Sequence, residues 1–261
     1  MEILNIHRVY FSATYTTKKV VRSVAESFKG NYADYDITQS LPETDILIGK
    51  DTLLIVGVPV YSGRVPLAAT SALRRFKGDG TPAVIVCVYG NREYDDALLE
   101  LKKIVQQNGF KVISAGAFIA QHSIFPAIGY GRPDEKDRAA IKTFADKSKE
   151  FLTSVTDTSA LPDIKVKGNH PYKVPNSIPL RPKGDRKCNK CGICVELCPA
   201  KAIPPNAPRQ TNKATCFSCG RCIVVCPKHA RHFGGLLYKM AGKKFVKAFS
   251  VRKEPETILI S

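Results

Sequence analysis

Eight of the nine cysteines lie in two runs of equal spacing in the last third of the chain. The runs are Cys188, Cys191, Cys194 and Cys198, followed by Pro199, and Cys216, Cys219, Cys222 and Cys226, followed by Pro227. Each run reads C-x2-C-x2-C-x3-C-P, in which three closely spaced thiolates wrap one face of an iron–sulfur cubane. The doubled pattern predicts two [4Fe–4S] clusters.

The fourth cysteine of each such run ligates the cluster of the other run. We therefore predict a first ligand set that consists of Cys188, Cys191, Cys194 and Cys226. The second ligand set consists of Cys216, Cys219, Cys222 and Cys198.

Structural zinc sites and disulfides are the alternatives to iron–sulfur clusters for these eight cysteines. Zinc sites use two C-x2-C pairs or add histidines, and a third close cysteine with a trailing proline fits them poorly. Disulfides belong to oxidising compartments, and the N-terminus carries an early acid, Glu2, and no signal-peptide pattern. The stretch resembles bacterial-type two-cluster ferredoxins, and Cys198–Ile203 (CPAKAI) fits that resemblance.

The charge of the chain is uneven. Residues 1–162 contain 20 Lys and Arg against 18 Asp and Glu, whereas residues 163–261 contain 20 against 5. Two clusters, each about −2 when oxidised, offset only part of this surplus. We expect an acidic redox partner; an anionic membrane surface or nucleic acid are the alternatives. No stretch reaches the roughly 18 apolar residues of a membrane span, and oxygen-sensitive clusters predict a cytoplasmic protein.

The first 155 residues alternate apolar runs with helical patterns, which predicts an α/β doubly wound sheet of five parallel strands. The predicted strands cover residues 4–11, 33–37, 53–58, 83–88 and 111–120. The predicted helices cover residues 20–28, 66–76, 95–107 and 134–152. The ninth cysteine, Cys87, falls within the fourth strand and is predicted to be a buried packing residue.

A hydroxyl-rich loop, residues 12–17, joins the first strand to the first helix. Backbone N–H groups, hydroxyls and a helix N-terminus together form an anion site, and a phosphate is the natural occupant. The alternative is that these residues only cap the helix. Two more unusual loops, residues 59–66 and 89–94, follow the third and fourth strands at the same sheet edge, where such sheets bind ligands.

Residues 1–155 resemble flavodoxins, whose phosphate loop has the form S/T-x-T-G-x-T. Ser12, Thr14 and Thr17 match it, and Tyr15 replaces the glycine. The resemblance implies FMN, the strand order 2-1-3-4-5 and binding residues in all three loops. These are Ser12, Thr14, Tyr15, Thr16 and Thr17, then Pro59, Val60, Tyr61, Ser62 and Gly63, and finally Tyr89, Gly90, Asn91, Arg92 and Tyr94.

Within these loops, Tyr61, Tyr89 and Tyr94 are the candidate rings to stack on a flavin. His122, just after the fifth strand, is either a residue at the flavin edge or a surface or capping histidine. The dinucleotide fingerprint GxGxxG is absent after the first strand, which argues against a nicotinamide dehydrogenase.

The predicted organisation is a flavodoxin-like FMN-binding domain (1–155), a proline-rich linker (156–186), a two-[4Fe–4S] ferredoxin domain (187–233) and a basic amphipathic tail (234–261). The tail contains a helix whose stripe Leu237, Ala241, Phe245 and Phe249 packs on the chain itself, on a membrane surface or in a partner groove. The chain thus resembles flavodoxin–ferredoxin fusion proteins, electron carriers of anaerobic microbes. The alternatives are a flavin-dependent reductase fed by the clusters and a redox-responsive nucleic-acid-binding module.

Overall fold

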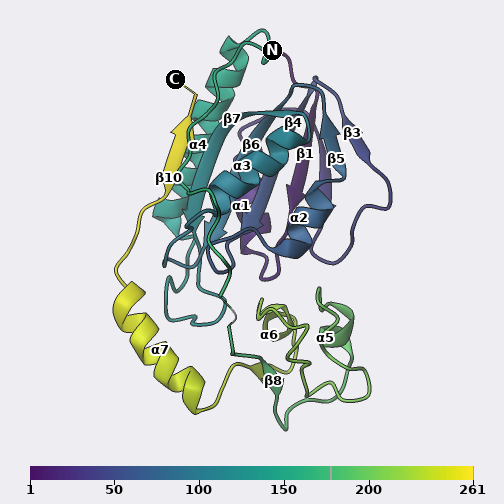
Figure 1. The fold of residues 1–261 in the computed structure, drawn as a ribbon, viewed down its shortest axis with the longest axis vertical. Coiled ribbons are helices and arrows are strands. Elements are labelled where there is room, and N and C mark those ends of the chain that lie inside the picture. The colour runs from purple at the N-terminus through teal and green to yellow at the C-terminus, as the bar shows by residue number, and fades with distance from the viewer. Residues whose placement is uncertain (177, 261) are drawn as a thin grey trace.

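The protein is described by a computed structural model over residues 1–176 and 178–260 (Figure 1). Ser177 of the predicted linker and Ser261 of the predicted tail therefore lie outside the described residues. A single mixed sheet forms the centre of the larger part, in the order β10-β7-β6-β4-β1-β2. Its strands are β1 (Asn5–Tyr10), β2 (Asn31–Asp36), β4 (Thr52–Pro59), β6 (Thr81–Tyr89), β7 (Phe110–Ile119) and β10 (Glu256–Leu259).

The five N-terminal strands of this sheet are parallel. Numbered among themselves along the chain, they take the order 2-1-3-4-5, which is the order of flavodoxin-like sheets. The two central strands, β4 and β6, are apolar along almost their whole length, since helices cover both faces of the sheet. Cys87 lies in β6 and is fully buried, as predicted.

The sheet has a sixth strand, so the predicted count of five strands was wrong. β10 runs antiparallel to β7 at the edge, with Glu256 opposite Ala117 and Leu259 opposite Ser114. This strand comes from the predicted tail, which therefore returns to the N-terminal sheet. Its four residues, two of them polar, give too short a pattern to be read as a strand without their partner.

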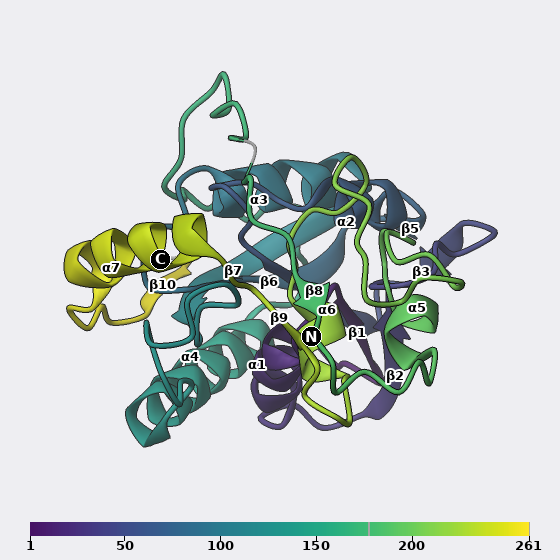
Figure 2. The same cartoon turned by 90° about the horizontal axis from the view of Figure 1, so that it is seen from below.

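Two pairs of helices cover the sheet, one pair on each face (Figure 2). α1 (Thr16–Ala25) and α4 (Glu135–Ser154) pack on one face, where Val20, Val24 and Phe144 join the apolar core. α2 (Leu67–Leu73) and α3 (Ala97–Gln107) pack on the other face. A small parallel sheet of β3 (Ile46–Ile48) and β5 (Phe76–Gly78) was not predicted. The predicted helix 66–76 extends too far, because Phe76 lies in β5.

The cysteine-rich part lies beyond the carboxyl ends of the parallel strands (Figure 1). It contains two short helices, α5 (Ile193–Glu196) and α6 (Arg221–Val224), and an antiparallel pair, β8 (Lys183–Gly184) and β9 (Arg231–His232). The two helices begin after Gly192 and Gly220, whose φ values of 83° and 81° are nearly the same. The repeated sequence thus gives a repeated backbone.

The segment before the first cysteine run packs on the surface of the larger part. The Asp96 carboxylate accepts hydrogen bonds from the backbone N–H groups of Asn169 (2.8 Å) and Lys173 (2.6 Å). Ile164 is buried in the core of the α2–α3 face.

The helix of the predicted tail, α7 (Leu236–Phe249), packs on the chain itself. Ala241, Phe245 and Phe249 contact a cluster that includes Phe125 and Phe233. Leu237, the fourth residue of the predicted stripe, is instead 55% exposed. No helix among the described residues is both long enough and apolar enough to span a bilayer.

Candidate functional site

The hydroxyl-rich loop after β1 is fixed by its own side chains and a neighbouring strand end. The Ser12 N–H donates to Thr38 Oγ1 (2.8 Å), and Ser12 Oγ accepts a bond from the N–H of Lys18 (3.0 Å). Ser12 and Thr17 are buried, while Thr14 and Thr16 approach each other at 3.3 Å between their hydroxyl oxygens. The loop ends at the N-terminus of α1, whose first N–H groups have no partner within the helix. This is the arrangement that binds a phosphate.

Tyr15 adopts the backbone conformation that a glycine would take in this loop. Its φ is 66°, in the left-handed region that non-glycine residues rarely enter. A non-glycine residue held there costs about 1–3 kcal/mol, and such residues concentrate at functional sites. Tyr15 therefore occupies a position whose backbone conformation favours glycine.

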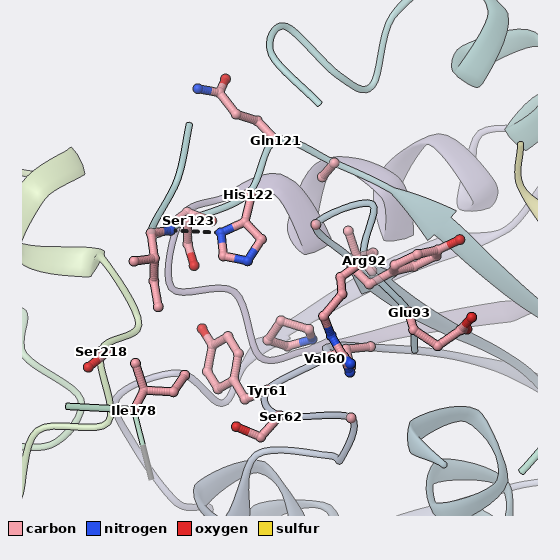
Figure 3. A pocket seen from close by; sticks show the side chains of 18 of the residues that line it. Val60, Tyr61, Ser62, Arg92, Glu93, Gln121, His122, Ser123, Ile178 and Ser218 are labelled. Atoms are coloured by element: carbon pink, nitrogen blue, oxygen red, sulfur yellow. Dashed lines mark hydrogen bonds between the residues drawn. The ribbon is translucent and has the colours of Figure 1, made fainter. Parts of the chain in front are cut away.

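A cavity of about 300 Å³ lies at the carboxyl ends of the strands, which is within the range of ligand sites (Figure 3). The loops after β1, β4, β6 and β7 all contribute to it. The predicted FMN residues that line it are Thr14, Thr16, Pro59, Val60, Tyr61, Ser62, Gly63, Tyr89, Gly90 and Arg92.

Space around the cavity depends on glycine at position 90. A Cβ on Gly90 would lie 2.6 Å from the ring of His122, which is too close. The loops after β6 and β7 therefore pack directly against each other. Together with the phosphate-type loop and the cavity, this close packing of backbone fits a flat ring with a phosphate tail, as in FMN.

Five predicted FMN residues do not line the cavity: Ser12, Tyr15, Thr17, Asn91 and Tyr94. The first three belong to the phosphate-type loop, but their side chains are not part of the cavity lining. Tyr94, one of the predicted stacking rings, is fully buried outside the cavity lining, and its hydroxyl donates to the Glu256 carboxylate (2.6 Å).

Asn91 also lies outside the cavity lining and forms hydrogen bonds with the C-terminal segment. Its side-chain amide donates to the carbonyls of Phe249 (2.7 Å) and Val251 (2.8 Å), and its Oδ1 accepts from the N–H of Lys253 (3.1 Å). Asn91 therefore anchors the connection between α7 and β10.

His122 lines the cavity, so the surface alternative from the sequence does not apply. Its Nδ1 accepts hydrogen bonds from the N–H groups of Ile124 and Phe125, both at 3.1 Å. Burial, with a smaller effect from the nearby Arg92 guanidinium, lowers the pKa of His122 to about 4. The imidazole is thus neutral at pH 7, with its proton on Nε2.

The cysteine-rich part supplies a wall of the same cavity, which the sequence did not predict. Phe217 and Ser218, between Cys216 and Cys219, line it beside Tyr61. The ring centroids of Tyr61 and Phe217 are 5.9 Å apart, and that of Phe11 is 6.4 Å from each. Burial raises the pKa of Tyr61 well above its usual value, and the Cys219 sulfur adds to this, so the phenol stays neutral.

The eight cysteines surround two separate hollows. Cys188, Cys191, Cys194 and Cys226 line one hollow, and Cys198, Cys216, Cys219 and Cys222 line the other. The structure therefore brings together the members of each predicted ligand set, including the exchanged fourth cysteines. Within the described ranges, no three His, Cys, Asp or Glu side chains are arranged to hold a single metal ion.

Backbone N–H groups and a buried arginine lie next to several of the cysteine sulfurs. Cys198 Sγ accepts from the N–H of Ala202 (3.3 Å), and Cys226 Sγ accepts from the N–H of Ala230 (3.3 Å). The charge of the buried Arg231 lowers the pKa of Cys194 and Cys222, although burial raises both overall. Such donors and charges are what thiolate-ligated clusters require.

Comparison with known proteins finds a family match for the cysteine-rich part. Residues 187–231 match the family model of the 4Fe-4S dicluster domain. No curated protein matches the chain.

Among solved structures, the chain is similar to rubredoxin oxygen:oxidoreductase from Desulfovibrio gigas (14% identity, TM-score 0.40), covering 59% of this chain and 37% of that one. The chain therefore spans little more than a third of that protein. It is also similar to flavodoxin 1 from Bacillus cereus, with 16% sequence identity and a TM-score of 0.42, over 58% of this chain and 99% of that one. A Fusobacterium nucleatum flavodoxin bound to flavin mononucleotide has 15% identity and a TM-score of 0.39, over 56% of this chain and 98% of that one. By its strand order and its cysteine-rich match, the chain joins a flavodoxin-like domain to a 4Fe-4S domain.

Proposed function

We propose that the protein is an electron-transfer iron–sulfur flavoprotein, in which two [4Fe–4S] clusters and FMN exchange electrons and pass them to a redox partner. One observation carries this proposal. Phe217 and Ser218, which are part of the second cysteine run, line the cavity formed by the flavodoxin-type loops. The second ligand set and a flavin in this cavity would then be neighbours.

When bound, the clusters supply one-electron centres and FMN supplies a centre that takes one or two electrons. The chain's own residues position these groups. The loop at residues 12–17 would hold the phosphate, and Tyr61 lines the cavity near Cys219. His122, neutral with its proton on Nε2, presents a hydrogen-bond donor to the cavity.

The first ligand set is the natural place for a partner to dock. Cys191 is exposed, and the exposed Arg186, Lys187 and Lys190 are its neighbours in sequence. An acidic redox protein would be attracted to this surface, and its association would weaken as the salt concentration rises.

Cofactor content after strictly anaerobic purification is the first test. We expect about eight iron, eight sulfide and one FMN per chain, because each cubane contains four of each atom. Full clusters without bound or bindable flavin would contradict the proposal. In a protein with all cofactors, reduction of the clusters should be followed by loss of the oxidised flavin absorption within the same molecule, at a rate independent of protein concentration.

A second candidate function is reduction of a small molecule. A more apolar cavity of about 530 Å³ lies on the other side of Tyr61 and Phe217, and Cys216 lines it. A small acceptor there would be next to the second ligand set. Steady-state turnover of apolar aromatic acceptors such as quinones, with a reduced-cluster donor, would separate such an enzyme from a carrier.

A further inference from the structure

Arg221 extends from the second cysteine run into the phosphate-type loop of the other domain. It lies between Gly220 and Cys222 and is only 5% exposed. Its Nη1 donates to the carbonyl oxygens of Ser12 (3.2 Å) and Ala13 (3.3 Å). Its guanidinium carbon lies 4.5 Å from the centroid of the Tyr15 ring.

Arg221 is a buried cation without a carboxylate partner. No ion pair among the described residues includes it, and its buried Nε has no hydrogen-bond partner there. Removing such a charge from water is unfavourable unless negative charge or good acceptors surround it. Arg221 lies next to the second ligand set on one side and the phosphate-type loop on the other, so each adjacent site is expected to hold an anion.

The two hydrogen bonds from Arg221 affect the donors of the loop. The carbonyl of Ser12 shares a peptide group with the N–H of Ala13, and the carbonyl of Ala13 shares one with the N–H of Thr14. A hydrogen bond from a cation to a carbonyl polarises the peptide group, which makes its N–H a stronger donor. A phosphate would therefore be bound more tightly by a loop whose carbonyls face Arg221.

The aromatic ring at position 15 has a role in the same contact. A glycine would take the φ of 66° freely but would leave the guanidinium without a ring to stack on. The stacking of Arg221 on Tyr15 holds the side chain, and with it the left-handed backbone, in place. Gly220, directly before Arg221, has a φ of 81°, a backbone conformation that favours glycine at the start of α6.

We propose that Arg221 is a positioning residue of the FMN phosphate loop, so that flavin affinity depends on an intact second cysteine run. This inference rests on the proposed function, because it requires FMN in the cavity. It assigns part of the flavin site to the cysteine-rich domain, and it couples the assembly of one cofactor site to the affinity of the other.

The test is the dissociation constant of FMN, measured by quenching of flavin fluorescence on the full chain with assembled clusters. Arg221→Met should weaken FMN binding tenfold or more. Arg221→Lys should lie between Met and the wild type, since lysine keeps the charge but not the planar stacking. The matched control is Arg186→Met, which removes an equal charge from an exposed site in the same domain and should leave the affinity within twofold.

A double-mutant cycle separates positioning from a general loss of structure. In a Tyr15→Gly background, the loop reaches its conformation without the ring, so Arg221→Met should weaken FMN binding much less than in the wild type. If Arg221→Met lowers the iron content, Tyr15→Leu takes its place: weaker FMN binding with full iron supports the inference, and unchanged binding overturns it.

The outcomes distinguish the proposed function from the proposed role of Arg221. Wild-type protein that binds no FMN overturns the proposed function and this inference together. Wild-type protein that binds FMN, with an Arg221→Met variant that binds it equally well at full iron content, overturns the inference alone.

Discussion

The aromatic rings of Tyr61 and Phe217 lie 5.9 Å apart across the contact between the two domains. Tyr61 belongs to the loop after β4, whereas Phe217 immediately follows Cys216 of the second ligand set. Both residues line the 300 Å³ cavity and also the larger apolar cavity beside it. This pair therefore places an aromatic ring of the cysteine-rich part against a ring of the loop after β4, at the wall of the cavity.

Replacing Tyr61 with alanine should weaken FMN binding by about tenfold, because a lost aromatic contact is worth about 0.5–1.5 kcal/mol beyond its buried area. The measurement is a fluorescence titration with FMN. Phe217→Ala should instead slow the bleaching of the flavin after rapid reduction of the clusters, with full iron content. Bleaching at the wild-type rate in Phe217→Ala would show that electrons do not pass this contact.

Loss of one partner from the buried pair of Arg132 and Asp137 should be strongly destabilising. The guanidinium donates to both carboxylate oxygens at 2.5 and 2.8 Å, and both side chains are almost fully buried. Arg132 also donates to the carbonyl of Lys253 (2.9 Å), so the pair connects the start of α4 to the C-terminal segment.

Asp137→Ala should lower the free energy of unfolding by about 3–5 kcal/mol, because it leaves Arg132 buried without its counter-ion. The matched control is Asp146→Ala on the same helix, which breaks an exposed pair with Lys142 and an exposed hydrogen bond from Ser27, and should cost far less because water screens this carboxylate. Chemical denaturation of both variants measures the difference. Similar losses in the two variants would contradict the structure around Arg132.

The sequence predicts those features that depend on local pattern. The apolar runs 53–58 and 83–88 predict β4 and β6, because strands covered on both faces need such runs. The cysteine spacing likewise predicts the two ligand sets, whose members the structure places around separate hollows.

Features that depend on contacts between distant segments were missed. β10 exists only by pairing with β7, and Tyr94 is withdrawn from the cavity by Glu256, 162 residues further along the chain. Phe217 reaches the cavity at the carboxyl ends of the strands only because the cysteine-rich part packs against the sheet domain. No periodicity within a window of residues carries this information.

His122 should make the protein less stable at low pH. Burial, with a smaller effect from Arg92, lowers the pKa of His122 to about 4 from an unfolded value of 6.5. Since the unfolded chain binds the proton first, stability is full above pH 6.5 and falls as the pH drops toward 4, by up to about 3 kcal/mol.

The variant His122→Gln removes this titration. Denaturation midpoints at pH 7.5 and pH 5 should differ more for the wild type than for His122→Gln. Equal pH dependence in the two proteins would show that His122 is not buried in its neutral form.

Arg231 should raise the reduction potentials of both clusters. It is 2% exposed, lies near cysteines of both ligand sets, and is held by the carbonyl of Pro182 (3.0 Å) and that of Pro208. Its charge lowers the pKa of one cysteine in each set, Cys194 and Cys222. A buried cation favours the added negative charge of a reduced cluster.

Arg231→Met should therefore shift both cluster potentials to more negative values, by on the order of 50–100 mV for a charge a few ångströms away. Arg231→Lys keeps the charge and should shift them less, and the exposed Arg186→Met should leave them nearly unchanged because water screens its charge. Anaerobic redox titration followed by electron paramagnetic resonance measures each potential. Wild-type potentials in Arg231→Met, at full iron content, would mean that N–H···S bonds and burial alone set the potentials.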